Sequence, residues 1–374
     1  MSRARRVTNG KVRYGVVGVG AISQGSFMPG VRNTKNSEIT ALVTDDPEKA
    51  AAMKEEYGDL AVYDYDDLDK LLAADEVDAL YVATPNHLHT PYVVPALKAG
   101  VHVLLEKPMA VSEEDCKAMI AAAEESGAKL MIAYRLHFEP ATVAAISQVR
   151  DGDIGEPRVF TSTFSQALDP KNHRAEHGFD DGPVYDMGVY PINACRQFFG
   201  AEPVEVSAVA SRNADWGLDL DDTVGVTLRF PNDGLAVFVA SYAMDEYEHY
   251  SIVGAKGSVA FQPAFGYGVG LEYDVKTGGE TDHRSFPETD QFGGEAEYFS
   301  RCIIEDLDPE PDGEEGWCDV RIVEAVRRAL ETGRPQTLEP YTRKRRIELS
   351  QAMGLAPVGD VEMVNASDPS RNAD

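Results

Sequence analysis

Residues 11–23 read KVRYGVVGVGAIS, an apolar run that ends in two glycines one residue apart and a small serine three positions later. The G-x-G-x-x-S spacing lacks only the last glycine of the fingerprint that joins a strand to a helix in nucleotide-binding sheets. Gly18 permits the tight turn, Gly20 lets the backbone approach a pyrophosphate, and Ser23 allows close helix packing. Free N–H groups at the start of the helix favour phosphate. The residues expected at this pyrophosphate contact are Gly18, Gly20, Ala21 and Ile22.

The chain from residue 11 to about 135 alternates apolar runs with helical segments. The runs that we interpret as strands lie at 38–44, 78–84, 101–107 and 129–135, and the helical ones at 46–58, 66–74, 89–100 and 112–127. The last helix starts with a Ser-x-x-Asp capping box and ends at a glycine. Alternation of this length implies right-handed crossovers and a doubly wound parallel sheet. We therefore predict a Rossmann domain over 11–135.

The pattern changes after residue 136. A helix at 139–152 precedes runs with period-two alternation, several of them joined by Gly or Asn-Asp-Gly turns. These strands are expected at 156–165, 203–212, 221–230, 234–243, 247–255, 257–263 and 267–275. We predict an α+β domain over 136–356 with a large open, mainly antiparallel sheet and two late helices, at 293–306 and 314–333. Residues 357–374 are polar and unpatterned, so we expect a flexible tail.

The composition excludes several classes of partner. The 63 acidic residues outnumber the 35 basic ones, of which 13 are lysine, and the net charge is -28. Such a charge argues against nucleic acid or an anionic membrane as partner and is typical of salt-adapted proteins, because salt screens the self-repulsion. No apolar run approaches the roughly 20 residues of a membrane span, and the N-terminus lacks the apolar segment of an export signal, so we expect a cytoplasmic protein. The four widely spaced cysteines predict neither a disulfide nor a metal site.

The end of the second predicted strand bears on the choice of dinucleotide. NAD sites commonly place a carboxylate here for the ribose 2'-hydroxyl, whereas this strand ends on Thr44, with Lys49 one helical turn later. A hydroxyl and an ammonium suit a 2'-phosphate, so we favour NADP. Asp45 and Asp46 leave the alternative open, because either carboxylate could turn inward as in an NAD site.

Two further stretches follow the fourth and fifth predicted strands, ATPNHLH at 83–89 and EKPMA at 106–110. Ligands bind outside the carboxyl ends of strands in open α/β sheets, so both stretches should face the cofactor. The histidines could equally serve as packing and hydrogen-bonding groups at the start of a helix. A lysine held at a strand end by a proline is either a snorkelling side chain or a fixed cation of a site. The residues expected at the cofactor are Thr84, Pro85, Asn86, His89, Glu106 and Lys107.

The chain resembles the glucose-fructose oxidoreductase family, which includes inositol, dihydrodiol and sugar 1-dehydrogenases. The resemblance runs from about residue 12 to 338 and is carried by ATPNHLH, EKPMA, YRLHFEP, DMGVYPIN and GEEGWCDVRIVEA, in that order. With its acid-rich composition, the chain most resembles the haloarchaeal D-xylose dehydrogenases of this family, which use NADP. The resemblance implies a C-terminal sheet that supports homodimers or homotetramers and a role in pentose catabolism.

The resemblance also implies roles for individual residues. Lys107 matches the family's active-site lysine, Tyr190 its proton-transferring residue and Asp186 the acidic residue beside the substrate. Inositol-type members carry histidine at the position of Tyr190, so tyrosine places the chain in the sugar, oxidoreductase and dihydrodiol branch. Arg135 of YRLHFEP is expected near the cofactor. Arg174 lies close to where relatives place a Trp-Arg pair over the cofactor, although the tryptophan is absent and the spacing is shifted.

The resemblance and these residues together imply the oxidation of an aldopyranose, most readily D-xylose, at C1 to a lactone. Hydride would pass to NADP+, and Tyr190 would take the hydroxyl proton. A phenol with a pKa of about 10 is almost wholly protonated at neutral pH and therefore cannot readily accept a proton. The Lys107 ammonium at about 4 Å would lower that pKa. The alternatives are a dehydrogenase of another aldose, polyol or dihydrodiol, and a non-catalytic NADP-binding sensor. The sequence leaves open the exact sugar and whether the cofactor dissociates in each turnover.

Overall fold

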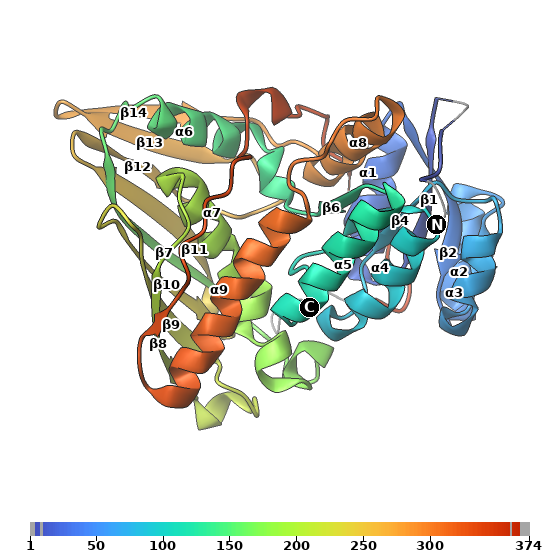
Figure 1. The fold of residues 1–374 in the computed structure, drawn as a ribbon, viewed down its shortest axis with the longest axis horizontal. Helices are drawn as coiled ribbons and strands as arrows, with labels where there is room; N and C mark the ends of the chain where they lie inside the picture. Colours follow the sequence, from blue (N-terminus) through green and yellow to red (C-terminus); the bar gives the residue numbers. More distant parts are fainter. Residues whose placement is uncertain (1–3, 8–9, 360, 367–374) are drawn as a thin grey trace. The chain divides into compact units, whose positions relative to one another are not determined.

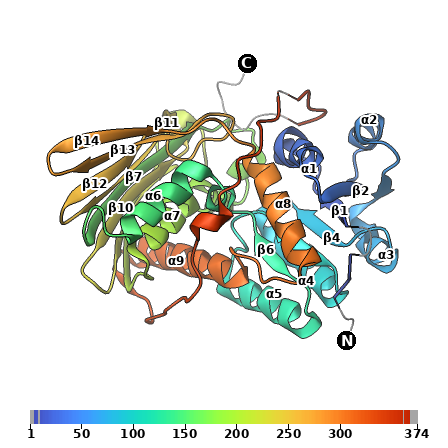
Figure 2. The same cartoon turned by 90° about the horizontal axis from the view of Figure 1, so that it is seen from above.

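The computed structural model describes residues 4–7, 10–359 and 361–366 (Figures 1 and 2). The chain forms two compact units. Unit 1 contains the chain up to Phe138, Asp290–Trp317 and the segment that starts at Met353, whereas unit 2 contains Glu139–Thr289 and Cys318–Ala352. Each unit has a sheet and a core of its own.

The sheet of unit 1 has the order β3-β2-β1-β4-β5-β6, and all of its strands are parallel. Its strands are β1 (Val12–Val17), β2 (Ser37–Val43), β3 (Ala61–Tyr63), β4 (Ala79–Val82), β5 (His102–Leu105) and β6 (Leu130–Ile132). The predicted Rossmann sheet is confirmed. The strand order reverses between β1 and β4, which in this class of sheet is the point where a ligand binds.

Helices flank this sheet, and α5 has the polar N-cap and the terminal glycine that the sequence predicts. The helices are α1 (Met28–Asn33), α2 (Pro47–Tyr57), α3 (Leu68–Ala73), α4 (His89–Lys98), α5 (Glu113–Ser126) and α8 (Gln291–Ile304). The predicted N-cap is confirmed, because the Ser112 side chain accepts a hydrogen bond from the Asp115 N–H, and the Ser112 hydroxyl donates to Asp115 Oδ2 at 2.6 Å. Gly127 ends α5 with a φ of 73°, a left-handed conformation that favours glycine.

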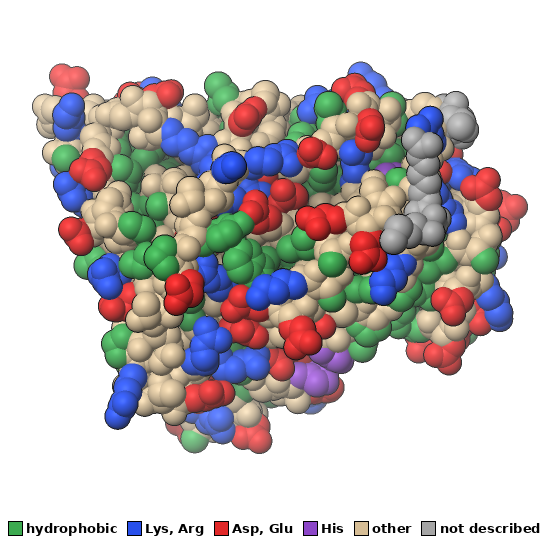
Figure 3. All heavy atoms as spheres, viewed as in Figure 1, with side chains coloured by type: hydrophobic (Ala, Val, Ile, Leu, Met, Phe, Trp, Pro, Cys, Tyr) green, Lys and Arg blue, Asp and Glu red, His purple; other side chains and the backbone are tan. Residues whose placement is uncertain are grey.

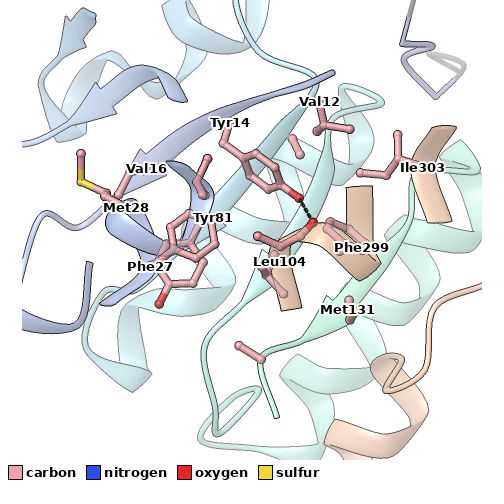
Figure 4. Packing of buried hydrophobic residues seen from close by; sticks show 14 of the residues in the cluster. Val12, Tyr14, Val16, Phe27, Met28, Tyr81, Leu104, Met131, Phe299 and Ile303 are labelled. Carbon is pink, nitrogen blue, oxygen red and sulfur yellow. Dashed lines mark hydrogen bonds between the residues drawn. The ribbon is translucent and has the colours of Figure 1, made fainter. Parts of the chain in front are cut away.

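The core of unit 1 is drawn in Figure 4, where apolar side chains of β1, β4 and β5 meet α8. Phe27 stacks on Tyr81 with ring centroids 3.6 Å apart. The Tyr14 hydroxyl lies 3.4 Å from the Ala296 carbonyl oxygen and 2.9 Å from Ser300 Oγ. Burying one large apolar side chain contributes about 2 kcal/mol, so the apolar face of α8 adds much to the stability of this unit.

The sheet of unit 2 has the order β14-β13-β12-β11-β7-β10-β9-β8-β15. Its strands are β7 (Pro157–Ala167), β8 (Glu205–Ser211), β9 (Thr223–Arg229), β10 (Leu235–Ser241), β11 (Ala243–Gly254), β12 (Gly257–Phe261), β13 (Glu272–Thr277), β14 (Glu280–Ser285) and β15 (Gln336–Thr337). Neighbouring strands are antiparallel except β7 and β10, which are parallel. The predicted open, mainly antiparallel sheet is therefore confirmed.

The main helices of unit 2 are α6 (Pro140–Arg150) and α7 (Val189–Phe199), and most of α9 (Gly313–Thr332) also belongs to it. Helix α6 is buried along one side, whereas α7 is buried over nearly all of its length and packs on β7. Arg196 of α7 is fully buried and is paired with Glu202 and Asp319. A buried guanidinium requires such partners, because an unpaired charge away from water is very costly.

The expected domain limits differ from the structure in three respects. Helix α8 was expected in the C-terminal domain, but it belongs to unit 1, because Ala296, Phe299 and Ile303 fill the core over β1. We expected residues 357–374 to form a flexible tail. This expectation is wrong for 361–366, because Val364 and Asn365 make hydrogen bonds to Gln24 and Asp46 of unit 1. Residues 367–374 lie outside the described residues. The first boundary, expected after 135, falls after Phe138.

Two features of the structure relate to what the composition predicts: the distribution of surface charge and the character of the helices. Acidic and basic side chains intermingle over the face that Figure 3 displays. Within the described part of the chain, no helix combines the length and the apolar character needed to cross a membrane.

Candidate active site

The glycine turn follows β1 and has the geometry that a pyrophosphate requires. Gly18 has a φ of 91°, and a Cβ there would lie 2.7 Å from the Ala83 carbonyl oxygen, so only glycine fits. A Cβ on Gly20 would meet no heavy atom within 4 Å, which leaves the backbone open to a ligand. Ser23 Oγ donates to the Gly18 carbonyl oxygen at 2.6 Å and closes the turn. The residues therefore fit a bound dinucleotide.

The helix that follows this turn is irregular. Ala21 and Ile22 are half-buried and lead into a π-helical turn, Ser23–Phe27, before α1 begins. Turns of this type are rare and occur often at functional sites. The two residues predicted at the pyrophosphate are thus accessible at the start of a helical segment.

The end of β2 holds the residues that bear on NADP. The Asp46 Oδ1 accepts hydrogen bonds from the backbone N–H groups of Glu48 and Lys49, at 2.9 and 3.1 Å, so Asp46 caps α2. Thr44 is buried, and its Oγ1 accepts the Asp46 N–H at 3.2 Å. Asp45 is exposed and Lys49 is half-buried. The Asp46 carboxylate is therefore turned to its own helix.

The turn after β4 contains one hydroxyl with unused hydrogen-bonding capacity. Thr84 is buried, and among the described residues its Oγ1 has no hydrogen-bond partner. Buried polar groups are nearly always paired, so this atom suits a polar ligand group. Pro85 and Asn86, which follow, are half-buried.

His89 was expected at the cofactor, but the structure places it inside the core with no exposed surface. Its Nε2 lies 3.0 Å from the Thr84 carbonyl oxygen and its Nδ1 lies 3.2 Å from that of Met109. Burial lowers the pKa of His89 to about 4, although the two carbonyl groups oppose the shift. His89 therefore braces the turn after β4 against the loop after β5, as the packing interpretation anticipated.

Lys107 follows β5 and is anchored through the residue before it. The Tyr81 hydroxyl donates to Glu106 Oε1 at 2.6 Å, and the Lys107 backbone N–H donates to Glu106 Oε2 at 3.2 Å. Burial raises the pKa of Glu106, while Lys107 and the Tyr81 hydrogen bond lower it. Lys107 itself is half-buried and precedes a cis bond to Pro108. The strand end thus carries a cation whose backbone is held by a neighbouring carboxyl group.

A second carboxyl group near Glu106 was not predicted. Glu295 of α8 is fully buried, and neither of its carboxyl oxygens has a hydrogen-bond partner among the described residues. Burial and then the charge of Glu106 raise the pKa of Glu295 well above its usual range, which favours its protonated form. Arg135, predicted at the cofactor, is buried and donates to Gln291 at the start of α8. No sequence signal identified Glu295, because α8 was assigned to the other domain.

Unit 2 carries the residues expected at the substrate. Asp186 lies in a π-helical turn, Val184–Gly188, that runs directly into α7. Tyr190, four residues after Asp186, lies in the first turn of α7. The Tyr190 ring is half-buried, with its centroid 5.4 Å from that of Phe164 and 5.6 Å from that of Phe265. An aromatic wall thus fixes the ring of Tyr190.

Asp186 is the centre of a polar cluster. Its Oδ2 lies 3.2 Å from Arg174 Nε and 3.1 Å from the Tyr242 hydroxyl, with Gln166 Nε2 at 3.5 Å. Burial, and then the charge of Asp186, raises the pKa of Tyr242 well above its usual range. Arg174, predicted at the cofactor, therefore pairs with the predicted substrate carboxylate. Tyr242 and Gln166 were missed, because Gln166, on β7, and Tyr242, between β10 and β11, belong to stretches whose pattern indicates only a sheet.

Two family models match this chain. The model described as an oxidoreductase family with an NAD-binding Rossmann fold matches residues 12–134, and that of the GFO/IDH/MocA C-terminal domain matches residues 142–260. The chain belongs to the GFO/IDH/MocA oxidoreductase family. The resemblance inferred from the motifs is therefore confirmed.

Several family members are similar over most of their length. A D-xylose 1-dehydrogenase [NADP(+)] of Haloarcula marismortui is 34% identical, over 87% of this chain and 92% of its own. A D-xylose 1-dehydrogenase (NADP(+)) of Haloferax volcanii is 30% identical, over 86% of this chain and 98% of its own. The solved structure of an aldose-aldose oxidoreductase from Caulobacter crescentus shares 35% identity and has a TM-score of 0.83, over 88% of this chain and 100% of its own.

Proposed function

We propose that the protein is an NADP-dependent sugar dehydrogenase that oxidises C1 of an aldopyranose, with D-xylose giving the lactone. The observation that carries the proposal is the anchoring of Lys107 by Glu106 and Tyr81 at the end of β5. These bonds hold the backbone of Lys107 at the carboxyl end of a parallel strand, where ligands bind in such sheets, and a dehydrogenase needs a cation beside the reacting oxygen. The names of the two haloarchaeal relatives support the sugar and the cofactor.

The proposed choice of NADP rests on the end of β2. Because Asp46 Oδ1 caps α2 and its Oδ2 accepts a hydrogen bond from Asn365, both carboxylate oxygens are already engaged, which leaves Thr44 and Lys49 for a 2'-phosphate. Gly18 and Gly20 would hold the pyrophosphate, and the unpaired Thr84 hydroxyl would bind a polar group of the dinucleotide. The bound nicotinamide supplies the hydride acceptor.

The proposed acid–base chemistry belongs to Lys107, Tyr190 and Asp186. Tyr190 takes the proton of the C1 hydroxyl, and Lys107 favours the tyrosinate and stabilises the negative charge that develops on the sugar oxygen. Asp186, oriented by Arg174 and Tyr242, accepts a hydrogen bond from a sugar hydroxyl. This division of roles predicts that Tyr190→Phe lowers kcat far more than it weakens cofactor binding.

Absorbance at 340 nm with a panel of aldoses, at molar KCl and with NADP+ or NAD+, tests the proposal. D-xylose with NADP+ should give the highest kcat/KM, and Lys107→Met and Tyr190→Phe should reduce it by about 100-fold or more. Fluorescence titration with NADPH provides a readout that is independent of turnover. NADPH binding without oxidation of any aldose would instead indicate a non-catalytic sensor, and preference for a polyol or dihydrodiol would overturn the sugar assignment.

A second function is favoured by the aldose-aldose oxidoreductase similarity. An enzyme of this kind would pass hydride from one aldose to another without releasing its cofactor. Product analysis separates the two functions, because such an enzyme forms equal amounts of lactone and alditol from aldoses without added NADP+.

We also propose that the protein forms homo-oligomers through the open sheet of unit 2. Val253, Val159 and Leu235 are aligned across β11, β7 and β10, and Val237 lies on the same face. All four are between 39% and 45% exposed. A row of exposed aliphatic side chains on a chain of net charge -28 is a natural contact for a second copy.

A further inference from the structure

The segment Met363–Asn365 returns to the first residues of unit 1, where it is tied to the helix that follows the glycine turn. The Gln24 side chain forms two hydrogen bonds with the Val364 backbone: Nε2 donates to the carbonyl oxygen at 3.0 Å, and Oε1 accepts the N–H at 2.8 Å. Gln24 is almost fully buried, and its Nε2 also donates to the Val19 carbonyl oxygen at 3.0 Å. One side chain therefore joins this segment to the glycine turn.

A second contact lies beside Gln24. A Cβ on Gly25 would lie 3.3 Å from Met363 Sδ, so the absence of a side chain at Gly25 makes room for the thioether. The segment thus packs along the π-helical turn and does not merely touch it at one hydrogen bond.

The other end of the segment is tied to the start of α2. Asn365 Nδ2 donates to Asp46 Oδ2 and to Glu48 Oε2, both at 3.0 Å. Its φ is 48°, a left-handed conformation that asparagine tolerates. The hydrogen bond from Asn365 is the largest cause of the lowered pKa of Asp46. Both oxygens of Asp46 are therefore engaged, one by α2 and the other by Asn365.

These contacts connect the two places where a Rossmann sheet holds the adenosine half of its cofactor. The glycine turn contacts the pyrophosphate, and the end of β2 contacts the adenosine ribose. We propose that Met363–Asn365 is a strap that lies along the adenosine half of bound NADP and slows its release. This inference rests on the cofactor proposed above, and it deepens that proposal by assigning the residues that govern how long the cofactor stays.

The strap has a consequence for the two candidate functions. A cofactor that leaves slowly suits repeated hydride transfer between aldoses, whereas a dehydrogenase must release NADPH in each turnover. Gln24 and the strap would therefore set how long the cofactor stays bound. None of these residues is assigned to the chemistry.

The test is the rate of NADPH release, measured by stopped-flow fluorescence after mixing the NADPH-loaded protein with excess NADP+ at molar KCl. Asn365→Ala should release NADPH about 5- to 10-fold faster, because it removes one donor shared by two carboxylates. Truncation after Gly359 should accelerate release further. Glu362→Gln, an exposed change in the same segment, is the matched control and should stay within about 2-fold of the wild type.

Two results would overturn the proposal, and they are distinguishable. The strap is rejected if Asn365→Ala and the truncated protein both release NADPH at the wild-type rate while their circular dichroism matches that of the wild type. The NADP assignment would then remain intact. Failure of the wild-type protein to bind NADPH would reject the cofactor assignment and the strap with it.

Discussion

The contacts of Glu106 explain how a lysine is held at a strand end. The Tyr81 hydroxyl and the Lys107 backbone N–H each occupy one oxygen of this carboxyl group. Burial raises the pKa of Glu106, and the Tyr81 hydrogen bond works in the opposite direction. Tyr81 therefore keeps Glu106 ionised over a wider range of pH.

We predict that Tyr81→Phe moves the acid limb of the pH profile of kcat/KM to higher pH, by about one unit. The variant keeps the ring that stacks on Phe27 and loses only the hydroxyl, so the pKa of Glu106 should rise. Tyr14→Phe removes another buried hydroxyl of the same core and is the control. Identical acid limbs in the three proteins would show that Glu106 does not need Tyr81.

His89 makes stability depend on pH. Its pKa is about 4 in the folded state and about 6.5 in the unfolded chain, so the unfolded state binds more protons between these values. The free energy of unfolding therefore falls as the pH decreases from 6.5 toward 4. At pH 5 His89 should account for about 2 kcal/mol of the loss relative to pH 7.

The prediction is checked by urea unfolding of His89→Gln at pH 7 and pH 5. The variant should be less stable at pH 7 but should lose less stability between the two values than the wild type. His283→Gln is the control, because His283 is exposed and its pKa is raised by Asp274. If the wild type and His89→Gln lose the same free energy of unfolding between pH 7 and pH 5, His89 is not the source of the pH dependence.

Single residues also show what could be predicted from the sequence. Gly18, Gly20 and Lys107 lie where their motifs placed them, because the spacing of a turn or strand end fixes their positions. Glu295 could not be found, because its burial depends on which sheet α8 covers. The sequence also allowed two roles for His89, and only its complete burial favours bracing.

At the scale of elements, α7 is joined to α9 by buried charges. Arg196 Nε lies 2.6 Å from Glu202 Oε2, and its guanidinium also pairs with Asp319 of α9. Asn193 donates to Asp319 at 3.1 Å, and Arg346 lies 2.8 Å from Glu202. The charges thus compensate one another inside unit 2.

Arg196→Met should destabilise the protein by about 3–5 kcal/mol, because Asp319 and Glu202 would stay buried without this cation. Urea unfolding measures the loss. Arg229→Met, which breaks the exposed pair with Glu205, should change stability far less, because solvent screens that pair. If Arg196→Met and Arg229→Met lower the free energy of unfolding by similar amounts, burial does not explain the contribution of Arg196.

The alternation of strands and helices predicted most of the elements, because that pattern follows from local periodicity. The Ser112 N-cap of α5 and the helix over 46–58 are confirmed. The assignment of α8 was wrong, because an amphipathic helix carries an apolar face but no indication of its partner sheet. Strand β14 was also missed, since all of its residues are exposed and it lacks apolar alternation.

At the scale of the molecule, the net charge of -28 predicts stabilisation by salt. Raising KCl from 0.2 to 3 M should increase Tm by about 10 °C or more, because the repulsion among carboxylates is screened. Differential scanning fluorimetry over a KCl series measures the effect. A Tm that falls or stays constant would contradict salt adaptation.

The open sheet of unit 2 predicts the assembly state. The wild type should be a homo-oligomer by light scattering, and Val237→Glu should dissociate it by placing a charge on the exposed apolar row. Val62→Glu alters a similarly exposed valine of β3 in unit 1 and should leave the assembly intact. A monomeric wild type would refute the proposed contact.

The central claim is that the Lys107 ammonium and the Tyr190 hydroxyl act together on the sugar oxygen. The most direct measurement is a crystal structure of the complex with NADP and D-xylose. The account predicts a distance of about 4 Å or less between Lys107 Nζ and Tyr190 Oη, with both atoms beside the C1 hydroxyl. Separation beyond the reach of one bridging water, or a sugar bound with C1 away from both groups, would contradict it.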